Sequence, residues 1–168
     1  MMEQEGPCQA GGSSRTANSV PPVLAATAGR CFFHILQQQV GFSGDGWVLE
    51  GSAEYTGYKF TADYGLMPFA TIKSWLTNNC GASNEPSLRD LEISFIAPDN
   101  RYVIAWHAWD YLLDGPGFSA IGRYLGFGIF SGAFGKRLNQ FYDDFEVYRR
   151  TLRPTPATAA ACQILNHS

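Results

Sequence analysis

Residues 118–150, FSAIGRYLGFGIFSGAFGKRLNQFYDDFEVYRR, carry the most distinctive pattern of this chain. The centre of the segment, residues 126–135, places four glycines among large apolar side chains. A glycine inside a helix costs roughly 1 kcal/mol relative to alanine, whereas glycines in strands mark bulges, sharp bends and close backbone approaches. The pattern therefore predicts bent, extended backbone of the kind that closes a small barrel around an apolar ligand.

The composition indicates one folded domain with a large apolar core. The 168 residues are 45% hydrophobic, 14% aromatic and 16% charged, whereas about 25% of an average domain is charged. The net charge of −3 provides no basic surface for nucleic acid. The apolar residues 118–134 include Arg123 and are shorter than the roughly 20 residues of a membrane span. We therefore expect no nucleic-acid partner and no membrane span.

The four cysteines, at positions 8, 31, 80 and 162, are scattered and form no C-x-x-C pair. Together with three scattered histidines, they do not have the spacing of a zinc site. We interpret the cysteines as reduced thiols of a cytoplasmic protein and expect no metal.

Two terminal segments differ in composition from the middle of the chain. Residues 1–29 are rich in Gly, Ser, Pro, Ala and Gln and contain no aromatic residue, and residues 153–168 are similar. Such segments cannot bury enough apolar surface to offset the entropy of ordering. We expect two flexible tails around one domain at 30–152.

Within residues 30–152, most signals are typical of strands. Residues 53–64, 88–96 and 101–113 are β-rich runs, and a strong turn at 114–117 follows the last of them. Pro68 near the start and Gly81 after the end predict a short helix at 68–79. Residues 31–40 fit a strand or a short helix. At 136–151, apolar residues repeat at helical spacing, but partial alternation also fits a strand.

Residues 128–135, GIFSGAFG, resemble the G-x-F-x-G-A-x-G signature of allene oxide cyclases, and dirigent proteins carry a related signature. The similarity covers about residues 99–148, and the family's N-terminal catalytic residues cannot be placed on this sequence. The resemblance implies a mainly β fold, a small antiparallel, calycin-like β-barrel with one or two short helices. It also implies a hydrophobic pocket and a homo-oligomer, either a dimer or a trimer.

The same resemblance implies a function in secondary metabolism. Such families guide the cyclisation or coupling of reactive small molecules without a cofactor. We therefore expect a cofactor-independent cyclase or isomerase that folds a hydrophobic small-molecule substrate in a barrel pocket. Two alternatives stay open. One is a non-catalytic, lipocalin-like carrier of a hydrophobic ligand, and the other is a helix-grip protein of the polyketide-cyclase type with a C-terminal helix at 134–152.

Alternation of side chains along two predicted strands selects the candidate site. We predict His107 as a general acid or base, Tyr111 as a hydrogen-bond donor, and Glu54 as a proton donor or acceptor with a raised pKa. The predicted substrate-binding residues are Trp109, Tyr58, Phe60, Trp106 and Asp110. The alternative interpretation is an ordinary aromatic core with a structural histidine and a solvent-facing glutamate.

Overall fold

A computed structural model describes residues 22–44, 46–79, 87–93 and 100–152, and all regular secondary structure in these ranges is helical. Eight helices and no strand occur among the described residues. The helices are α1 (Pro22–Gln39), α2 (Gly46–Asp63), α3 (Phe69–Asn79), α4 (Asp90–Ile93), α5 (Asn100–Leu113), α6 (Ser119–Phe127), α7 (Phe130–Phe134) and α8 (Leu138–Arg149). The predicted β-barrel is therefore wrong, and so is the cyclase or carrier function that depended on a barrel pocket.

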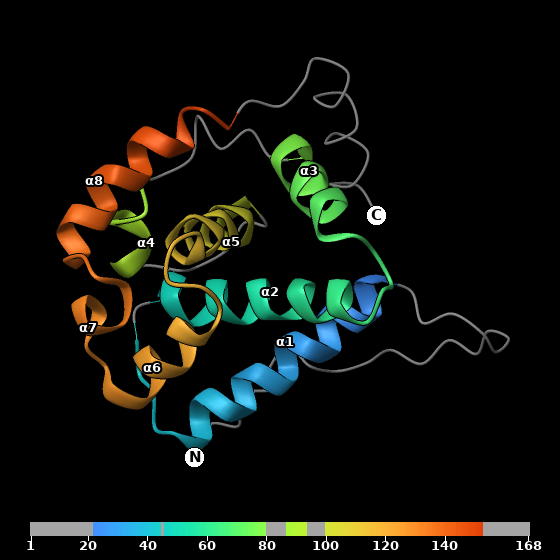
Figure 1. Cartoon of the computed structure of the whole chain (residues 1–168), viewed down its shortest axis with the longest axis horizontal. Helices are drawn as coiled ribbons and strands as arrows, with labels where there is room; N and C mark the ends of the chain where they lie inside the picture. The colour runs from blue at the N-terminus through green and yellow to red at the C-terminus, as the bar shows by residue number, and fades with distance from the viewer. Residues whose placement is uncertain (1–21, 45, 80–86, 94–99, 153–168) are drawn as a thin grey trace, which may run out of the picture.

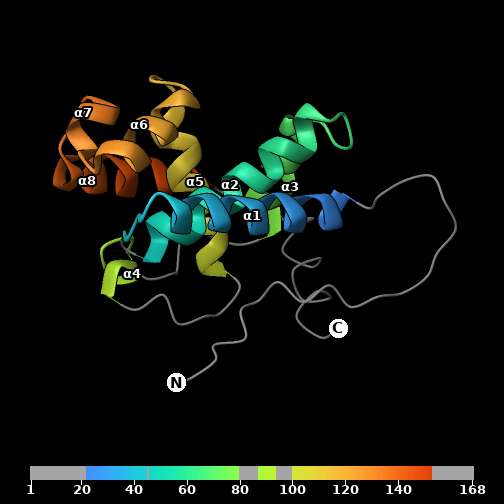
Figure 2. The same cartoon turned by 90° about the horizontal axis from the view of Figure 1, so that it is seen from below.

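The helix α2 lies at the centre of the arrangement (Figure 1). The most extensive contacts between helices are those of α2 with α1 and with α5. The helix α3 lies at one end of the molecule, whereas α6, α7 and α8 gather at the opposite end in both views (Figure 1, Figure 2). The fold is thus organised around one central helix with a long partner on each of two sides.

Glycines allow α2 to approach both of these partners closely. A Cβ atom added at Gly57 would lie 2.3 Å from the carbonyl oxygen of Ala26 in α1, and one added at Gly29 would lie 2.9 Å from the Gly57 Cα. Toward α5, a Cβ atom at Gly51 would lie 2.7 Å from the Ala105 Cβ. Carbon atoms in contact are normally about 3.5–4.0 Å apart. The helices can therefore pack this closely only where α2 has no side chain.

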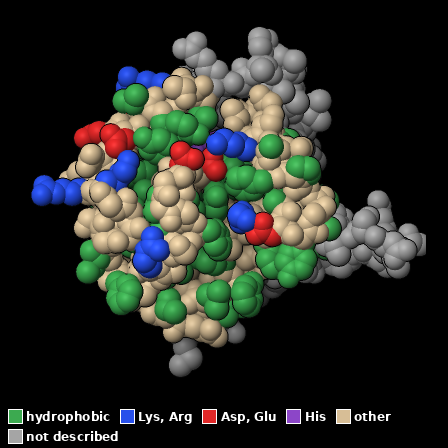
Figure 3. All heavy atoms as spheres, viewed as in Figure 1, with side chains coloured by type: hydrophobic (Ala, Val, Ile, Leu, Met, Phe, Trp, Pro, Cys, Tyr) green, Lys and Arg blue, Asp and Glu red, His purple; other side chains and the backbone are tan. Residues whose placement is uncertain are grey.

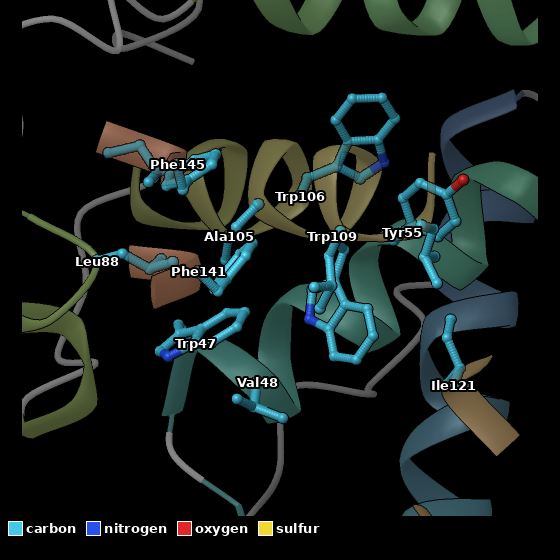
Figure 4. Packing of buried hydrophobic residues seen from close by; sticks show 14 of the residues in the cluster. Trp47, Val48, Tyr55, Leu88, Ala105, Trp106, Trp109, Ile121, Phe141 and Phe145 are labelled. Carbon is cyan, nitrogen blue, oxygen red and sulfur yellow. The ribbon is translucent and has the colours of Figure 1, made fainter. Parts of the chain in front are cut away.

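The helix α5 is buried on nearly every side. Residues 103–109 are all buried, and Trp106 and Trp109 have no exposed surface. Figure 4 shows the Trp109 ring directed toward α2 and the Trp106 ring directed away from it. A helix that is buried all round has no polar stripe, and periodicity alone cannot distinguish its apolar run from a buried strand. The strand predicted at 101–113 is wrong for this reason.

The glycine-rich residues 126–135 form the ends of two short helices instead of a pair of bent strands. Gly128 (φ 67°) ends α6 and donates its N–H to the Tyr124 carbonyl, and Gly135 (φ 71°) ends α7 and donates to the Ser131 carbonyl. Glycine adopts this left-handed conformation without steric cost, so helices commonly end on it. The helix penalty from which the barrel was predicted therefore does not apply to these two glycines.

Other sequence predictions have mixed outcomes. The helix predicted at 68–79 is confirmed by α3, and the helical alternatives for 31–40 and 136–151 correspond to α1 and α8. The strand predicted at 53–64 is wrong, because these residues belong to α2. Of the strand predicted at 88–96, residues 90–93 form α4, and residues 94–96 lie outside the described ranges. The first helix begins at Pro22, ahead of the predicted domain boundary at residue 30.

Aromatic side chains fill the core where α2, α5 and α8 meet. The Trp47 ring stacks on Phe141 with ring centroids 5.6 Å apart, and the Trp47 indole N–H donates to the Tyr142 hydroxyl at 3.0 Å. The Trp109 ring of α5 packs against Phe134 of α7, with ring centroids 5.7 Å apart. These contacts connect the C-terminal helices to α2 and α5, and Figure 4 shows Trp47 beside Phe141.

Two glycine substitutions, one at the contact of α1 with α2 and one on the exposed surface of α6, are expected to change the free energy of unfolding in opposite directions. Gly57→Ala is expected to lower the free energy of unfolding by about 3 kcal/mol, because the new methyl group would overlap the α1 backbone. Gly122→Ala, at an exposed position of α6 with nothing within 4 Å, is expected to raise it by up to about 1 kcal/mol. Urea unfolding followed by circular dichroism measures both changes. A Gly57→Ala variant that is as stable as the wild-type protein would contradict the observed packing of α1 on α2.

Candidate functional site

The structure does not bring the three predicted catalytic residues together. His107 and Tyr111 lie one turn apart on α5, and His107 faces α3. Glu54 lies on α2 and faces Arg30 of α1. The Tyr111 ring stacks on Tyr148 of α8 with centroids 4.5 Å apart. The catalytic roles of these residues stay predictions, and their side chains face three different helices.

His107 is a buried histidine with 1% of its surface exposed. Burial, and then the positive charge of Lys73, lower the pKa of His107 to about 4. The Leu76 backbone carbonyl opposes this shift, although it does not meet the geometry of a full hydrogen bond. The imidazole is therefore neutral at pH 7 and out of contact with solvent. This environment favours a structural histidine over a proton shuttle.

The predicted substrate-binding residues also separate. Trp106 and Trp109 belong to the core. Asp110 pairs with Lys73 of α3 at 2.6 Å. Tyr58 lines a small cavity of about 260 Å³ between the start of α1, α2 and α3. Phe60 lines a larger cavity, which is described below. The alternation that grouped these residues belongs to a strand, and a helix distributes them over several faces.

A cluster of charged side chains connects α1, α2 and α5. Arg30 of α1 forms salt bridges with Glu50 at 2.8 Å and with Glu54 at 3.2 Å, both on α2. The Arg30 guanidinium also lies 4.4 Å from the ring centre of Tyr102 in α5. The Nε2 atom of His34 lies 3.4 Å from the Glu50 carboxylate. Arg30 is thus the shared cation of two carboxylates at the interface of three helices.

The two carboxylates of this cluster differ in their acidity. Burial raises the pKa of Glu54, and the attraction of Arg30 does not fully offset this rise. Burial also acts to raise the pKa of Glu50, but contacts with His34 and Arg30 outweigh it and hold the pKa below its usual value. No group of three or more His, Cys, Asp or Glu side chains in the described ranges could hold a metal ion. We interpret the cluster as a structural link between helices.

An apolar, half-open cavity of about 560 Å³ lies between α1 and α2. Small-molecule sites in proteins commonly have volumes of roughly 300–1,000 Å³. The cavity walls include Phe32, Phe33 and Leu36 of α1, Thr56 and Phe60 of α2, and Phe118 just before α6. Phe32, Phe60 and Phe118 are 60%, 42% and 44% exposed. Hydrophobic side chains, green in Figure 3, follow the lower part of this face, where Figure 1 places α1 and α6.

Thr56 places an unusual polar atom in the cavity wall. Its hydroxyl oxygen is buried and has no hydrogen-bond partner among the described residues. Three other helical threonines, Thr27, Thr61 and Thr77, donate to the carbonyl four residues earlier at 2.8–3.0 Å. A buried hydroxyl without a partner costs about 1–3 kcal/mol. The cavity wall therefore contains one hydroxyl that the protein itself leaves unsatisfied, and its oxygen is covered in the observed rotamer.

The charged residues of the cavity neutralise each other. Lys59 and Asp63 line the cavity and form an ion pair one turn apart on α2. The other lining residues, all of them uncharged, are Ala28, Gly29, Phe32, Phe33, Leu36, Thr56, Phe60 and Phe118. The lining as a whole carries no net charge.

Sequence reasoning found only one residue of this cavity, Phe60. Phe32 and Phe33 form an aromatic pair within 31–40, a segment whose pattern fits both a strand and a short helix. A helix that continues back to Pro22 would have placed this pair on a long amphipathic helix beside α2. The cavity could therefore have been found from the sequence only if the helix had been extended toward the N-terminus as far as Pro22.

The structure also bears on two expectations, the one about the cysteines and the one about a membrane span. Cys31 is disulfide-bonded, so its interpretation as a reduced thiol is wrong. Since disulfides are rare in cytosolic proteins, the argument for a cytoplasmic location loses its basis. Among the described residues, no helix has both the length and the apolar character that crossing a membrane requires.

Comparisons with known proteins give no relative. No protein-family model, no curated protein and no solved structure matches this chain. The resemblance of residues 128–135 to allene oxide cyclases thus stays a prediction, while the barrel that it implied is not formed by the described residues.

The charged cluster predicts unequal effects for its members. Arg30→Gln is expected to lower the free energy of unfolding by about 2 kcal/mol, because it leaves two partly buried carboxylates without a cation. Glu54→Gln is expected to change it by less than about 1 kcal/mol, because Arg30 keeps Glu50 as its partner. Chemical unfolding at pH 7 measures both values. A larger loss in Glu54→Gln than in Arg30→Gln would contradict this assignment.

The same cluster predicts opposite pH dependences for its two carboxylates. The lowered pKa of Glu50 stabilises the fold above the unfolded value of about 4.3, and this contribution is lost as the pH falls through the folded pKa. The raised pKa of Glu54 makes stability fall as the pH rises from about 4.3 through its folded pKa. Unfolding between about pH 3 and pH 8 should show the acid-side loss reduced in Glu50→Gln and increased in Glu54→Gln. Identical pH profiles of stability for Glu50→Gln and Glu54→Gln would refute the opposite pKa shifts of the two carboxylates.

Proposed function

We propose that this protein binds an apolar small molecule in the cavity between α1 and α2. The observation that carries this proposal is the half-open cavity of about 560 Å³, in whose wall three phenylalanines, Phe32, Phe60 and Phe118, are exposed to solvent. Covering apolar surface stabilises a complex by roughly 25 cal/mol per Å². The site is formed by helices, so it differs from the barrel pocket of the cyclase and from the lipocalin-like carrier.

The residues of the cavity support binding more than catalysis. Its polar side chains are Thr56, Lys59 and Asp63, and Lys59 and Asp63 are already paired with each other. Nucleophilic or acid–base catalysis requires a nucleophile or titratable group held beside a partner that activates it. The lining residues contain no such arrangement.

Titration with naphthalene, followed by its fluorescence, tests the proposed function. Wild-type protein is expected to bind one naphthalene per chain in a saturable manner. Ala28→Phe, which places a ring on the cavity wall, is expected to weaken binding at least tenfold. Gln38→Phe is the matched control, because Gln38 is an exposed residue of α1 that does not line the cavity.

Two outcomes would oppose the proposed function. The first is the absence of saturable binding to the wild-type protein. The second is an equal loss of affinity in Ala28→Phe and Gln38→Phe, which would place the binding site elsewhere. Circular dichroism spectra of all three proteins show whether each variant keeps its helical fold.

The outer face of α1 supports a second proposal, a contact with another copy of the chain. Leu24 and Ile35 lie on one face of this helix and are each at least half exposed. Arg30, the residue of α1 with a permanent charge, is engaged with Glu50 and Glu54. Two such faces can therefore meet around a two-fold axis without burying an unpaired charge.

Light scattering after size-exclusion chromatography tests this contact. The wild-type chain is expected to be a dimer, and the double variant Leu24→Lys with Ile35→Lys is expected to be a monomer. Phe127→Lys on α6 is the control, since Phe127 is also strongly exposed but lies on another helix. A monomeric wild-type protein would rule out the dimer.

A further inference from the structure

We propose that the ligand of the α1–α2 cavity is an uncharged molecule with one hydrogen-bonding group on an otherwise apolar, ring-containing frame. This inference rests on the proposed function and specifies the chemical class of its ligand. Three properties of the cavity support it: an unsatisfied hydroxyl, a neutral lining and aromatic walls.

The hydroxyl of Thr56 accounts for the single polar group. Its oxygen is buried without a partner, while Thr61 on the same helix donates its hydroxyl to the Gly57 carbonyl. Because this oxygen is covered in the observed rotamer, the proposed contact requires a change of about 120° in χ1 to the other rotamer that threonine adopts in helices, which would present the hydroxyl to a ligand. A hydroxyl both donates and accepts, so an alcohol, a phenol, a ketone or an amide could satisfy it.

The paired charges of the lining account for the lack of charge on the ligand. Lys59 already forms an ion pair with Asp63. A ligand carboxylate would have to compete with Asp63 for this lysine, and a ligand amine would have to compete with Lys59. Burying an ion without a free counter-ion is strongly unfavourable. The cavity therefore provides no free counter-ion for a charged molecule of the same size.

The aromatic walls account for the ring-containing frame. Phe32 and Phe33 contribute rings from α1, Phe60 contributes one from α2, and Phe118 contributes one before α6. Aromatic rings pack favourably in offset-stacked or edge-to-face arrangements beyond the effect of buried area. Such walls fit a flat ring system better than a flexible chain, which would lose more conformational freedom on binding.

A series of three ligands with the same ring system tests the inference. Naphthalene has no polar group, 1-naphthol has one neutral hydroxyl, and 1-naphthoate is an anion at pH 7. The wild-type protein is expected to bind 1-naphthol about threefold to tenfold more tightly than naphthalene, as one neutral hydrogen bond provides. It is expected to bind 1-naphthoate more weakly than either.

The substitution Thr56→Val connects this preference to one atom. The valine side chain has nearly the same shape without the hydroxyl, so the variant is expected to bind 1-naphthol and naphthalene with equal affinity. Its affinity for naphthalene should match that of the wild-type protein. Thr77→Val is the control, because the Thr77 hydroxyl is bonded to the Lys73 carbonyl on α3 and lies outside the cavity lining. This control should keep the preference for 1-naphthol.

The outcomes separate this inference from the proposed function. If none of the three ligands binds, the proposed function fails. If naphthalene binds as tightly as 1-naphthol, or if 1-naphthoate binds most tightly, the ligand class is wrong while the binding function stands. A loss of both neutral ligands in Thr56→Val, with circular dichroism showing an intact fold, would also overturn the role of the hydroxyl.

Discussion

The direct approach of the α1 and α2 backbones at Gly29 and Gly57 is the contact on which the rest of the structure depends. Polar contacts extend it toward the C-terminal end of α1. Arg30, next to Gly29, binds the two glutamates of α2. Further along α1, the buried Gln37 donates to the Ser52 hydroxyl at 2.9 Å and to the Leu49 carbonyl at 3.1 Å. The two long helices are thus held in one register by contacts of three different kinds.

The cavity follows from this geometry. Gly29 both touches Gly57 and lines the cavity, so the point of closest approach forms one side of the site. On the outer side, large phenylalanine rings replace glycine, and they hold open a space that the two helices do not fill. On the opposite side, Gly51 allows α5 and its tryptophans to pack against α2. One helix thereby supports the core with one face and the candidate site with another.

The sequence predicted the presence of a large apolar core and the helix α3, but it did not predict the helical fold. Glycine is informative about close approach and about positive φ, yet these needs arise in sheets and in helix bundles alike. In this chain Gly51 and Gly57 serve helix crossings, and Gly128 and Gly135 serve helix ends. The nearly complete burial of α5 leaves it without the polar stripe that would reveal its helical period.

The candidate site shows the same dependence on the assumed period. A period of two places Phe60 on one face with Glu54, Thr56 and Tyr58. A period of 3.6 keeps Thr56, four residues earlier, on the face of Phe60 but moves Glu54 and Tyr58 to another face. Glu54 and Tyr58 then face Arg30 and the small cavity instead. The residue types of the site were therefore visible in the sequence, whereas their grouping required the correct secondary structure.

Nuclear Overhauser contacts between the Hα protons of Gly29 and Gly57 test the central packing most directly. The structure predicts a strong cross-peak between these two glycines, together with helical Cα chemical shifts for residues 46–63 and 101–113. The absence of this cross-peak, accompanied by strand-type shifts in the same residues, would contradict the packing of α1 on α2 and the cavity that depends on it.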